Sequence, residues 1–160
     1  MRIGTSFDVH AFCRNRPLIL GGVEIPYELG LKGHSDADVL THAVCDAILG
    51  ALGQGDIGEH FPDTDPQYEN IGSLILLRHV CNIMREHDYD VENLDVTVIL
   101  QEPHISGYKG RIKIILAETM GIKPKSVNVK ATTTEHLGFT GRREGIAVQA
   151  VVLLKEIHEN

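Results

Sequence analysis

The segment from Ile146 to Leu154 restricts the fold most, because apolar residues fill it almost without interruption. A run of this length suits a β-strand, and a strand that is apolar at successive positions is covered on both faces. We expect helices to pack on one face and a second sheet, or another copy of the protein, to pack on the other. The segment therefore predicts an inner strand of an α/β protein that forms oligomers.

Shorter patterns predict the remaining elements. Extended, largely apolar segments predict strands over Arg2–His10, Leu18–Leu20, Val23–Ile25, Leu94–Leu100 and Ser126–Thr133. Apolar residues at helical spacing predict helices over Asp38–Leu52, Ser73–Glu86 and Gly110–Met120. This interleaved order indicates the α/β (α+β) class, as a two-layer sandwich with helices on one face of a mixed sheet. The length of 160 residues suits a single catalytic domain, residues 1–160.

Composition indicates the cellular compartment and argues against some classes of binding partner. The chain carries 15 Lys and Arg against 22 Asp and Glu, and its net charge of -7 argues against nucleic acid or an anionic membrane as a partner. Cys13, Cys45 and Cys81 are odd in number and lack C-x-x-C spacing, which indicates free thiols in a reducing compartment. The first predicted strand begins beside Met1 and no apolar run approaches a membrane span, so we expect a cytoplasmic protein.

A candidate metal centre lies near the start of the chain. Alternate side chains of a strand share a face, so Asp8 and His10 should point the same way while Val9 turns towards the core. His42, on the first predicted helix, is a third candidate ligand. Three nitrogen and oxygen ligands leave one tetrahedral position of a zinc ion open, which is the catalytic arrangement. Taken alone, an Asp-x-His tripeptide is more often a surface pair than a ligand pair.

The start of the His42 helix suggests further roles. Asp38 and Asp46 flank His42 at four-residue spacing, so either carboxylate could receive the second ring N–H of His42. Ser35, followed three residues later by Asp38, resembles a capping box. A helix N-terminus suits a phosphate group, with His34 as an added donor. The alternative, that Ser35 only caps the helix, requires no ligand.

Two further polar segments carry candidate ligand-binding groups. The first, from Asp56 to Asp65, is rich in carboxylates and can bind hydroxyls or cations, although a solvated acidic turn is the ordinary explanation of such a segment. The second, Thr132–Glu135, places hydroxyls and a carboxylate at a strand end before the cation Arg142. Together with metal ions these groups match a polyphosphate, because phosphoryl transfer needs positioning and charge neutralisation more than proton transfer.

With these residues, the chain resembles the family of 2-C-methyl-D-erythritol 2,4-cyclodiphosphate synthases, enzymes of the non-mevalonate isoprenoid pathway. The motifs that carry the resemblance occur in the family's order along the whole chain. They are Arg2–Gly4 leading to Asp8–His10, Gly21–Pro26, His34–Asp36, Gly55–Gly58, Phe61–Asp65 and Asn128–Glu135.

The resemblance implies an activity and roles for residues. In the family, the 2-phosphate of 4-diphosphocytidyl-2-C-methyl-D-erythritol 2-phosphate attacks the β-phosphorus of the same molecule, which closes a cyclic diphosphate and releases CMP. Asp8, His10 and His42 would bind Zn²⁺, and Glu135 would bind Mg²⁺ or Mn²⁺. His34 and Thr133 would be catalytic, as groups that stabilise the transition state. The implied substrate-binding residues are Asp8, Val9, His10, His34, Ser35, Asp56, Ile57, Gly58, Phe61, Pro62, Asp63, Thr64, Asp65, Thr132, Thr133, Thr134, Glu135, Phe139 and Arg142.

The resemblance also implies an assembly. The family is a homotrimer of ferredoxin-like subunits, with active sites between neighbouring chains that bind a cytidine diphosphate substrate. The metal-bearing side would come from one chain and the nucleotide-binding strand end from the next, which agrees with the apolar strand Ile146–Leu154. Phe139 and Arg142 would lie near a central cavity that can take an isoprenoid diphosphate in the family.

Two segments depart from the family's pattern. Arg143 stands where a small residue is usual, which adds charge and bulk beside the central cavity. In the loop Pro103–Tyr108, the residues His104, Ile105 and Ser106 replace a lysine-containing run with further prolines. This loop lines the cytosine pocket largely through backbone groups in the family, so we expect base recognition to rest on the backbone.

Two other functions use the same candidate ligands. A zinc phosphohydrolase would activate water at the open zinc position, and its product would be free phosphate or an acyclic monophosphate. A structural zinc site in an interaction module would instead make folding depend on the metal. The core expected for a chain of this size should fold without metal, which favours the enzyme.

Overall fold

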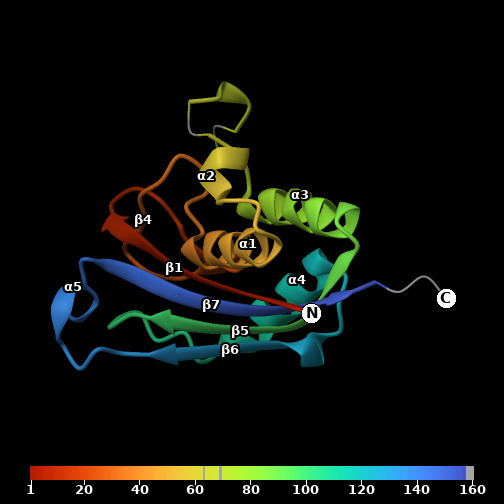
Figure 1. The fold of residues 1–160 in the computed structure, drawn as a ribbon. Helices are drawn as coiled ribbons and strands as arrows, with labels where there is room; N and C mark the ends of the chain where they lie inside the picture. Colours follow the sequence, from red (N-terminus) through yellow and green to blue (C-terminus); the bar gives the residue numbers. More distant parts are fainter. Residues whose placement is uncertain (63, 69, 158–160) are drawn as a thin grey trace.

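The computed structural model describes residues 1–62, 64–68 and 70–157 (Figure 1). Its main sheet has five strands in the order β4-β1-β7-β5-β6, and β2 and β3 form a separate two-stranded sheet. In the main sheet β5 and β6 are parallel and all other neighbours are antiparallel, so the sheet is mixed, as predicted. The strands are Arg2–Cys13 (β1), Leu18–Leu20 (β2), Val23–Ile25 (β3), Gly30–Leu31 (β4), Tyr89–Ile99 (β5), Val127–Thr132 (β6) and Gly145–Glu156 (β7).

The longer helices form one layer on the main sheet (Figure 1). They are Val39–Leu52 (α1), Ser73–Glu86 (α3) and Lys109–Met120 (α4). The shorter helical elements are Ile57–His60 (α2), Gly138–Gly141 (α5) and the 3-10 turns Pro66–Tyr68 (η1) and Pro124–Ser126 (η2). The predicted mixed α/β class with helices on one face of the sheet is confirmed.

Helix α1 approaches β1 closely because glycine occupies the crossing point. A Cβ atom on Gly4 would lie 1.9 Å from the carbonyl oxygen of Ala47. The Ser6 hydroxyl, on the same face of β1, donates to the carbonyl oxygen of Ala43 at 2.5 Å. The next residues on this face are Asp8 and His10, so the α1 contact positions the predicted metal ligands under the helix.

The opposite face of the sheet carries exposed apolar side chains. Ile3 is 72% exposed and Phe7 is 62% exposed. Val9 is 41% exposed on this same face, so the prediction that Val9 turns towards the core is wrong. The helices cover the face that holds Asp8 and His10, and alternation along the strand therefore directs Val9 away from them.

The order of elements differs from the ferredoxin-like pattern. A ferredoxin-like subunit has the order β-α-β-β-α-β. Here α1 and α3 lie between β1 and β5, α4 joins β5 to β6, and β7 follows β6 with only the short α5 between them. The predicted ferredoxin-like detail is therefore not confirmed.

Among residues 1–62, 64–68 and 70–157, no helix combines the length and the apolar character needed to cross a bilayer.

Candidate metal centre and adjoining cavity

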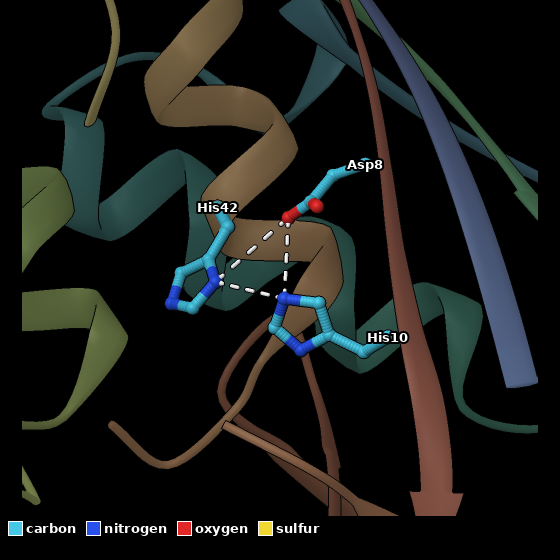
Figure 2. Close-up of side chains that lie close together, drawn as sticks. All are labelled: Asp8, His10 and His42. Atoms are coloured by element: carbon cyan, nitrogen blue, oxygen red, sulfur yellow. Dashed lines mark hydrogen bonds and ion pairs between the residues drawn. The ribbon is translucent and has the colours of Figure 1, made fainter. Parts of the chain in front are cut away.

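Asp8 and His10 of β1 and His42 of α1 come together where the strand faces the helix, as Figure 2 shows. The Nε2 atom of His10 lies 3.4 Å from Oδ2 of Asp8 and 3.4 Å from Nδ1 of His42. The third separation, from Nδ1 of His42 to Oδ2 of Asp8, is 3.8 Å. The predicted cluster of these residues is confirmed.

The geometry of the cluster fits a metal ion. Zinc holds nitrogen and oxygen ligands at about 2.0–2.2 Å, and tetrahedral angles then separate the ligand atoms by about 3.3–3.6 Å. The Nδ1 atom of His10 lies 3.0 Å from the carbonyl oxygen of Ala37. A carbonyl only accepts, so Nδ1 carries the proton and Nε2 keeps its lone pair for the cluster. Two imidazoles and a carboxylate thus form a site that can hold a metal ion.

The electrostatic environment favours the metal-binding forms of two ligands. Burial alone would raise the pKa of Asp8, but the neighbouring imidazoles of His10 and His42 outweigh it and lower that pKa. Burial, followed by the neighbouring His10, lowers the pKa of His42. Carboxylate and neutral imidazole are the forms that bind metals, because protons compete for the same lone pairs.

The second nitrogen of His42 does not contact either flanking aspartate. Its Nε2 atom lies 2.8 Å from the Ser73 hydroxyl and 3.1 Å from the Ser35 hydroxyl. The prediction that Asp38 or Asp46 receives this N–H is wrong. Asp38 accepts instead from the backbone N–H groups of Gly21 and Gly22, and Asp46 accepts from the backbone N–H of Ile57.

The start of α1 is capped by Asp38, not by Ser35. The Asp38 carboxylate accepts from the backbone N–H of Thr41 at 3.0 Å. The Ser35 hydroxyl accepts from the N–H of Ala37 at 3.1 Å, within the turn that precedes the helix. The predicted capping by Ser35 is therefore wrong. Burial raises the pKa of Asp38, although the hydrogen bonds from Thr41 and from the N–H groups of Gly21 and Gly22 oppose that shift.

A cavity of about 530 Å³ opens beside the three ligands, within the range of small-molecule sites. Its lining includes many of the residues predicted for the substrate and metals, namely Asp8, His10, His34, Ser35, His42, Ile57, Gly58, Phe61, Thr64 and Asp65. Sequence reasoning missed other lining residues, which are Gly33, Asp46, Pro66, Tyr68, Ile71 and Leu76. Val9, Asp56 and Pro62 do not line it, and Asp63 lies outside the described residues.

The predicted acidic loop is built around α2. Asp56 caps this helix through a hydrogen bond of 3.0 Å from the N–H of Glu59. The N–H of Ile57 donates to Asp46 on α1 at 2.7 Å, so the loop is attached one turn after His42. Phe61 packs against Tyr68 with ring centroids 5.3 Å apart, which joins the far end of the loop to η1.

The Thr132–Glu135 segment lies at the end of β6, away from the metal ligands. Strand register aligns Asp8 of β1 with Val148 of β7, then with Val98 of β5 and Ala131 of β6. Three strand spacings of about 4.8 Å separate the backbones at Asp8 and Ala131 by about 14 Å, and the Thr132–Glu135 segment follows Ala131. The Thr133 hydroxyl accepts from the N–H of Glu135 at 3.2 Å, and Thr134 contacts Thr140 through hydroxyl groups 2.8 Å apart.

The residues predicted near a central cavity lie around α5. Phe139 is 37% exposed, and Arg142 donates to Glu144 through Nε at 3.1 Å and Nη2 at 3.2 Å. Arg143 pairs with Glu102 at 3.0 Å. In the Pro103–Tyr108 loop, His104 and Ser106 are exposed, whereas Ile105 is only 2% exposed and belongs to the core.

The mixed sheet, its helical layer and the Asp-His-His cluster define an α/β protein with a candidate metal centre beside a ligand-sized cavity. The chain belongs to the YgbB family, whose model matches residues 1–155. It is 57% identical over 155 residues to 2-C-methyl-D-erythritol 2,4-cyclodiphosphate synthase of Geobacillus thermodenitrificans (strain NG80-2), an alignment that covers 97% of each chain.

Solved structures agree with this assignment. The bifunctional IspDF of Campylobacter jejuni is 48% identical with a TM-score of 0.93, and the match covers 97% of this chain and 42% of that one. The CDP complex of IspF from Plasmodium falciparum is 34% identical with a TM-score of 0.86, and the match covers 98% and 97% of the two chains. The predicted family is confirmed, and with it the predicted enzyme class, a phosphorus–oxygen lyase.

Proposed function

We propose that this enzyme converts 4-diphosphocytidyl-2-C-methyl-D-erythritol 2-phosphate into 2-C-methyl-D-erythritol 2,4-cyclodiphosphate and CMP, in a metal-dependent step of isoprenoid precursor biosynthesis. The observation that carries the proposal is the convergence of Asp8, His10 and His42 at the wall of the cavity. The relatives named as the synthase and the CDP bound to the Plasmodium falciparum protein support the same substrate class.

The donor sets suit the proposed metals. Asp8, His10 and His42 would hold Zn²⁺, for which imidazole and carboxylate are ordinary ligands. Glu135 would hold Mg²⁺ or Mn²⁺, which prefer oxygen ligands. When bound, these cations polarise phosphoryl oxygens and neutralise the charge that develops on the leaving phosphate.

The chain's own residues would position the substrate. A phosphate monoester is already ionised at neutral pH, so the attacking group needs orientation and not a general base. His34 and Thr133 would donate hydrogen bonds to phosphoryl oxygens where negative charge develops. Ile57 and Gly58 at the cavity wall, with Asp56 before them, would hold the methylerythritol part. The remaining proposed contacts are Val9, Ser35, Phe61, Pro62, Asp63, Thr64, Asp65, Thr132, Thr134, Phe139 and Arg142.

The proposed assembly is a homotrimer with shared active sites. Within one chain the Thr132–Glu135 cluster lies three strands from the metal ligands, so a second copy must bring the two clusters together. The exposed apolar face with Ile3 and Phe7 supports such an assembly, because soluble proteins cover surfaces of this kind.

Complementation between variants tests the shared site. His42→Ala removes the metal side, and Thr133→Ala removes the strand-end side, so each variant alone should be nearly inactive. Co-expressed chains should regain about a quarter of wild-type activity, because random mixing pairs one intact metal side with one intact strand end in about one of four interfaces. Mixed chains that remain inactive would contradict a site shared between copies.

Isotope labelling separates cyclisation from hydrolysis. Attack by the substrate's own phosphate brings no oxygen from the solvent into the product, whereas hydrolysis adds one. Turnover in ¹⁸O-water should therefore give unlabelled cyclodiphosphate and unlabelled CMP by mass spectrometry. A labelled acyclic phosphate would contradict the cyclisation and show that the enzyme is a phosphohydrolase.

We also propose a single catalytic domain and a cytoplasmic location. The match of the family model to residues 1–155 supports one catalytic domain over residues 1–160. Cys13, Cys45 and Cys81 are free thiols, which supports the reducing environment of the cytoplasm.

A further inference from the structure

Ser73 joins the metal ligand His42 to a carboxylate in a different segment. The Ser73 hydroxyl lies 2.8 Å from Nε2 of His42 and also donates a hydrogen bond to Oδ1 of Asp36. Ser73 begins α3, whereas Asp36 lies in the turn before α1, so the contact links two elements at the metal centre. Ser73 is fully buried, which keeps water from competing for its hydroxyl.

The direction of these hydrogen bonds follows from chemistry. A carboxylate at neutral pH only accepts, so the single hydroxyl proton of Ser73 is committed to Asp36. The Ser73 oxygen can then only accept from His42, which requires the proton of that imidazole to sit on Nε2. Figure 2 shows this nitrogen directed away from Asp8 and His10, while Nδ1 faces them.

Asp36 is itself held in a fixed orientation. Its Oδ2 atom accepts from the backbone N–H of Ser73 at 3.0 Å, and its Oδ1 atom accepts from the N–H of Asp38 at 3.2 Å. A carboxylate with these contacts has little freedom to turn away from the Ser73 hydroxyl. The hydrogen bonds that connect Asp36, Ser73 and His42 therefore have fixed partners and directions.

We propose that Ser73 and Asp36 are positioning residues that fix the Nε2–H form of His42 and so present its Nδ1 lone pair to the metal. The inference deepens the proposed function, because it rests on the metal site formed by Asp8, His10 and His42. Residues that orient a metal-bound histidine change metal affinity by about 10- to 100-fold when they are lost.

A purely structural role for the pair makes a different prediction. Asp36 accepts the first free N–H of α3, so the pair also anchors this helix to the turn before α1. Loss of an anchor alone would lower thermal stability and leave the affinity of the folded protein for metal unchanged. Metal affinity and histidine protonation therefore separate the two roles.

Zinc titration against a competing chelator tests the proposal in the full chain. Ser73→Ala should bind zinc about 10- to 100-fold more weakly than the wild type, while Ser126→Ala, far from the site, should bind normally. Asp36→Asn should weaken binding as well, and it serves if Ser73→Ala does not fold. Normal zinc affinity in folded Ser73→Ala and Asp36→Asn would overturn the proposal.

Nitrogen NMR of the metal-free protein with ¹⁵N-labelled histidine gives an independent readout. Wild-type His42 should carry its proton on Nε2, and Ser73→Ala should shift protons to Nδ1. A wild-type His42 protonated on Nδ1 would overturn the proposal. His42→Ala serves as the reference: if it binds zinc like the wild type, the metal site itself is wrong, which distinguishes failure of the proposed function from failure of the positioning role.

Discussion

The Asp46 carboxylate accepts a hydrogen bond of 2.7 Å from the backbone N–H of Ile57. Asp46 follows the candidate metal ligand His42 by one helical turn, and Ile57 lines the same cavity. One side chain thus sets the distance between the candidate metal centre and the loop proposed to hold the substrate's sugar-derived part.

Asp46→Ala should loosen this loop without removing the metal. Loss of one hydrogen bond is worth about 0.5–1.5 kcal/mol, so we expect KM to rise about 3- to 10-fold while zinc affinity stays normal. Asp46→Asn keeps an acceptor oxygen and should stay close to the wild type. Equal defects in both variants would show that the charge of Asp46, and not its hydrogen bond to Ile57, is what matters.

Thr133→Ala should act on turnover. Removal of one hydroxyl that donates to a developing oxyanion typically lowers kcat by about 100- to 1,000-fold. The Thr133 hydroxyl donates to the Glu135 carboxylate at 3.5 Å and accepts from the backbone N–H of the same residue at 3.2 Å. These contacts are local, so folding should be unaffected. Steady-state kinetics with Thr119→Ala as a distant control provides the measurement. A rise in KM with unchanged kcat would instead make the hydroxyl a binding contact felt equally in the ground and transition states.

The stability of the metal-free protein should depend on pH through His42. Burial, and then the neighbouring His10, lowers the pKa of folded His42 below the ordinary histidine value of about 6.5. Below that pH the unfolded chain takes up a proton that the folded chain resists, so the free energy of unfolding falls as the pH falls through 6.5.

Urea unfolding at about pH 7.5 and about pH 5.5 measures this dependence, since histidine changes charge in this range. The metal-free wild type should lose more stability between these values than His42→Gln does. His87→Gln, at an exposed position, should behave like the wild type. The same pH dependence in wild type and His42→Gln would contradict the role given to His42.

The contact between β1 and α1 can be tested with two glycines. Gly4→Ala should destabilise the fold by about 1–3 kcal/mol or more, because its Cβ would lie 1.9 Å from the Ala47 carbonyl oxygen. Gly50→Ala, in α1 and meeting only the Thr5 carbonyl at 4.0 Å, should stabilise it by about 0.5–1 kcal/mol. Thermal unfolding of both variants compares them, and tolerance of Gly4→Ala would contradict the close approach.

Sequence patterns predicted the parts of the fold that depend on regular spacing. The bounds of α3 at Ser73 and Glu86 follow from apolar residues at helical intervals, and the shared face of Asp8 and His10 follows from strand alternation. The elements β4, α2 and α5 have four residues or fewer, which is too short for any period to appear. The equally short β2 and β3 were predictable because their apolar residues flank the turn-forming pair Gly21–Gly22.

Contacts between distant segments could not be read from spacing. Ser35 and Asp38 both suit a helix cap, and the backbone N–H groups of Gly21 and Gly22 help to fix Asp38 in that role. The nearer of the two hydroxyls at His42 Nε2 belongs to Ser73, 31 residues along the chain, and the other belongs to Ser35, seven residues before His42. Helical spacing pointed to Asp38 and Asp46 instead. Val9 was misplaced because alternation gives two faces but does not say which one the helices cover.

Phosphorus NMR of the reaction tests the central claim most directly. The purified enzyme is incubated with 4-diphosphocytidyl-2-C-methyl-D-erythritol 2-phosphate, Zn²⁺ and Mg²⁺, with and without a chelator. We predict two coupled resonances of a cyclic diphosphate together with CMP, both abolished by the chelator. CMP accompanied only by acyclic phosphate, or turnover that persists after the metals are removed, would contradict the metal-dependent cyclisation.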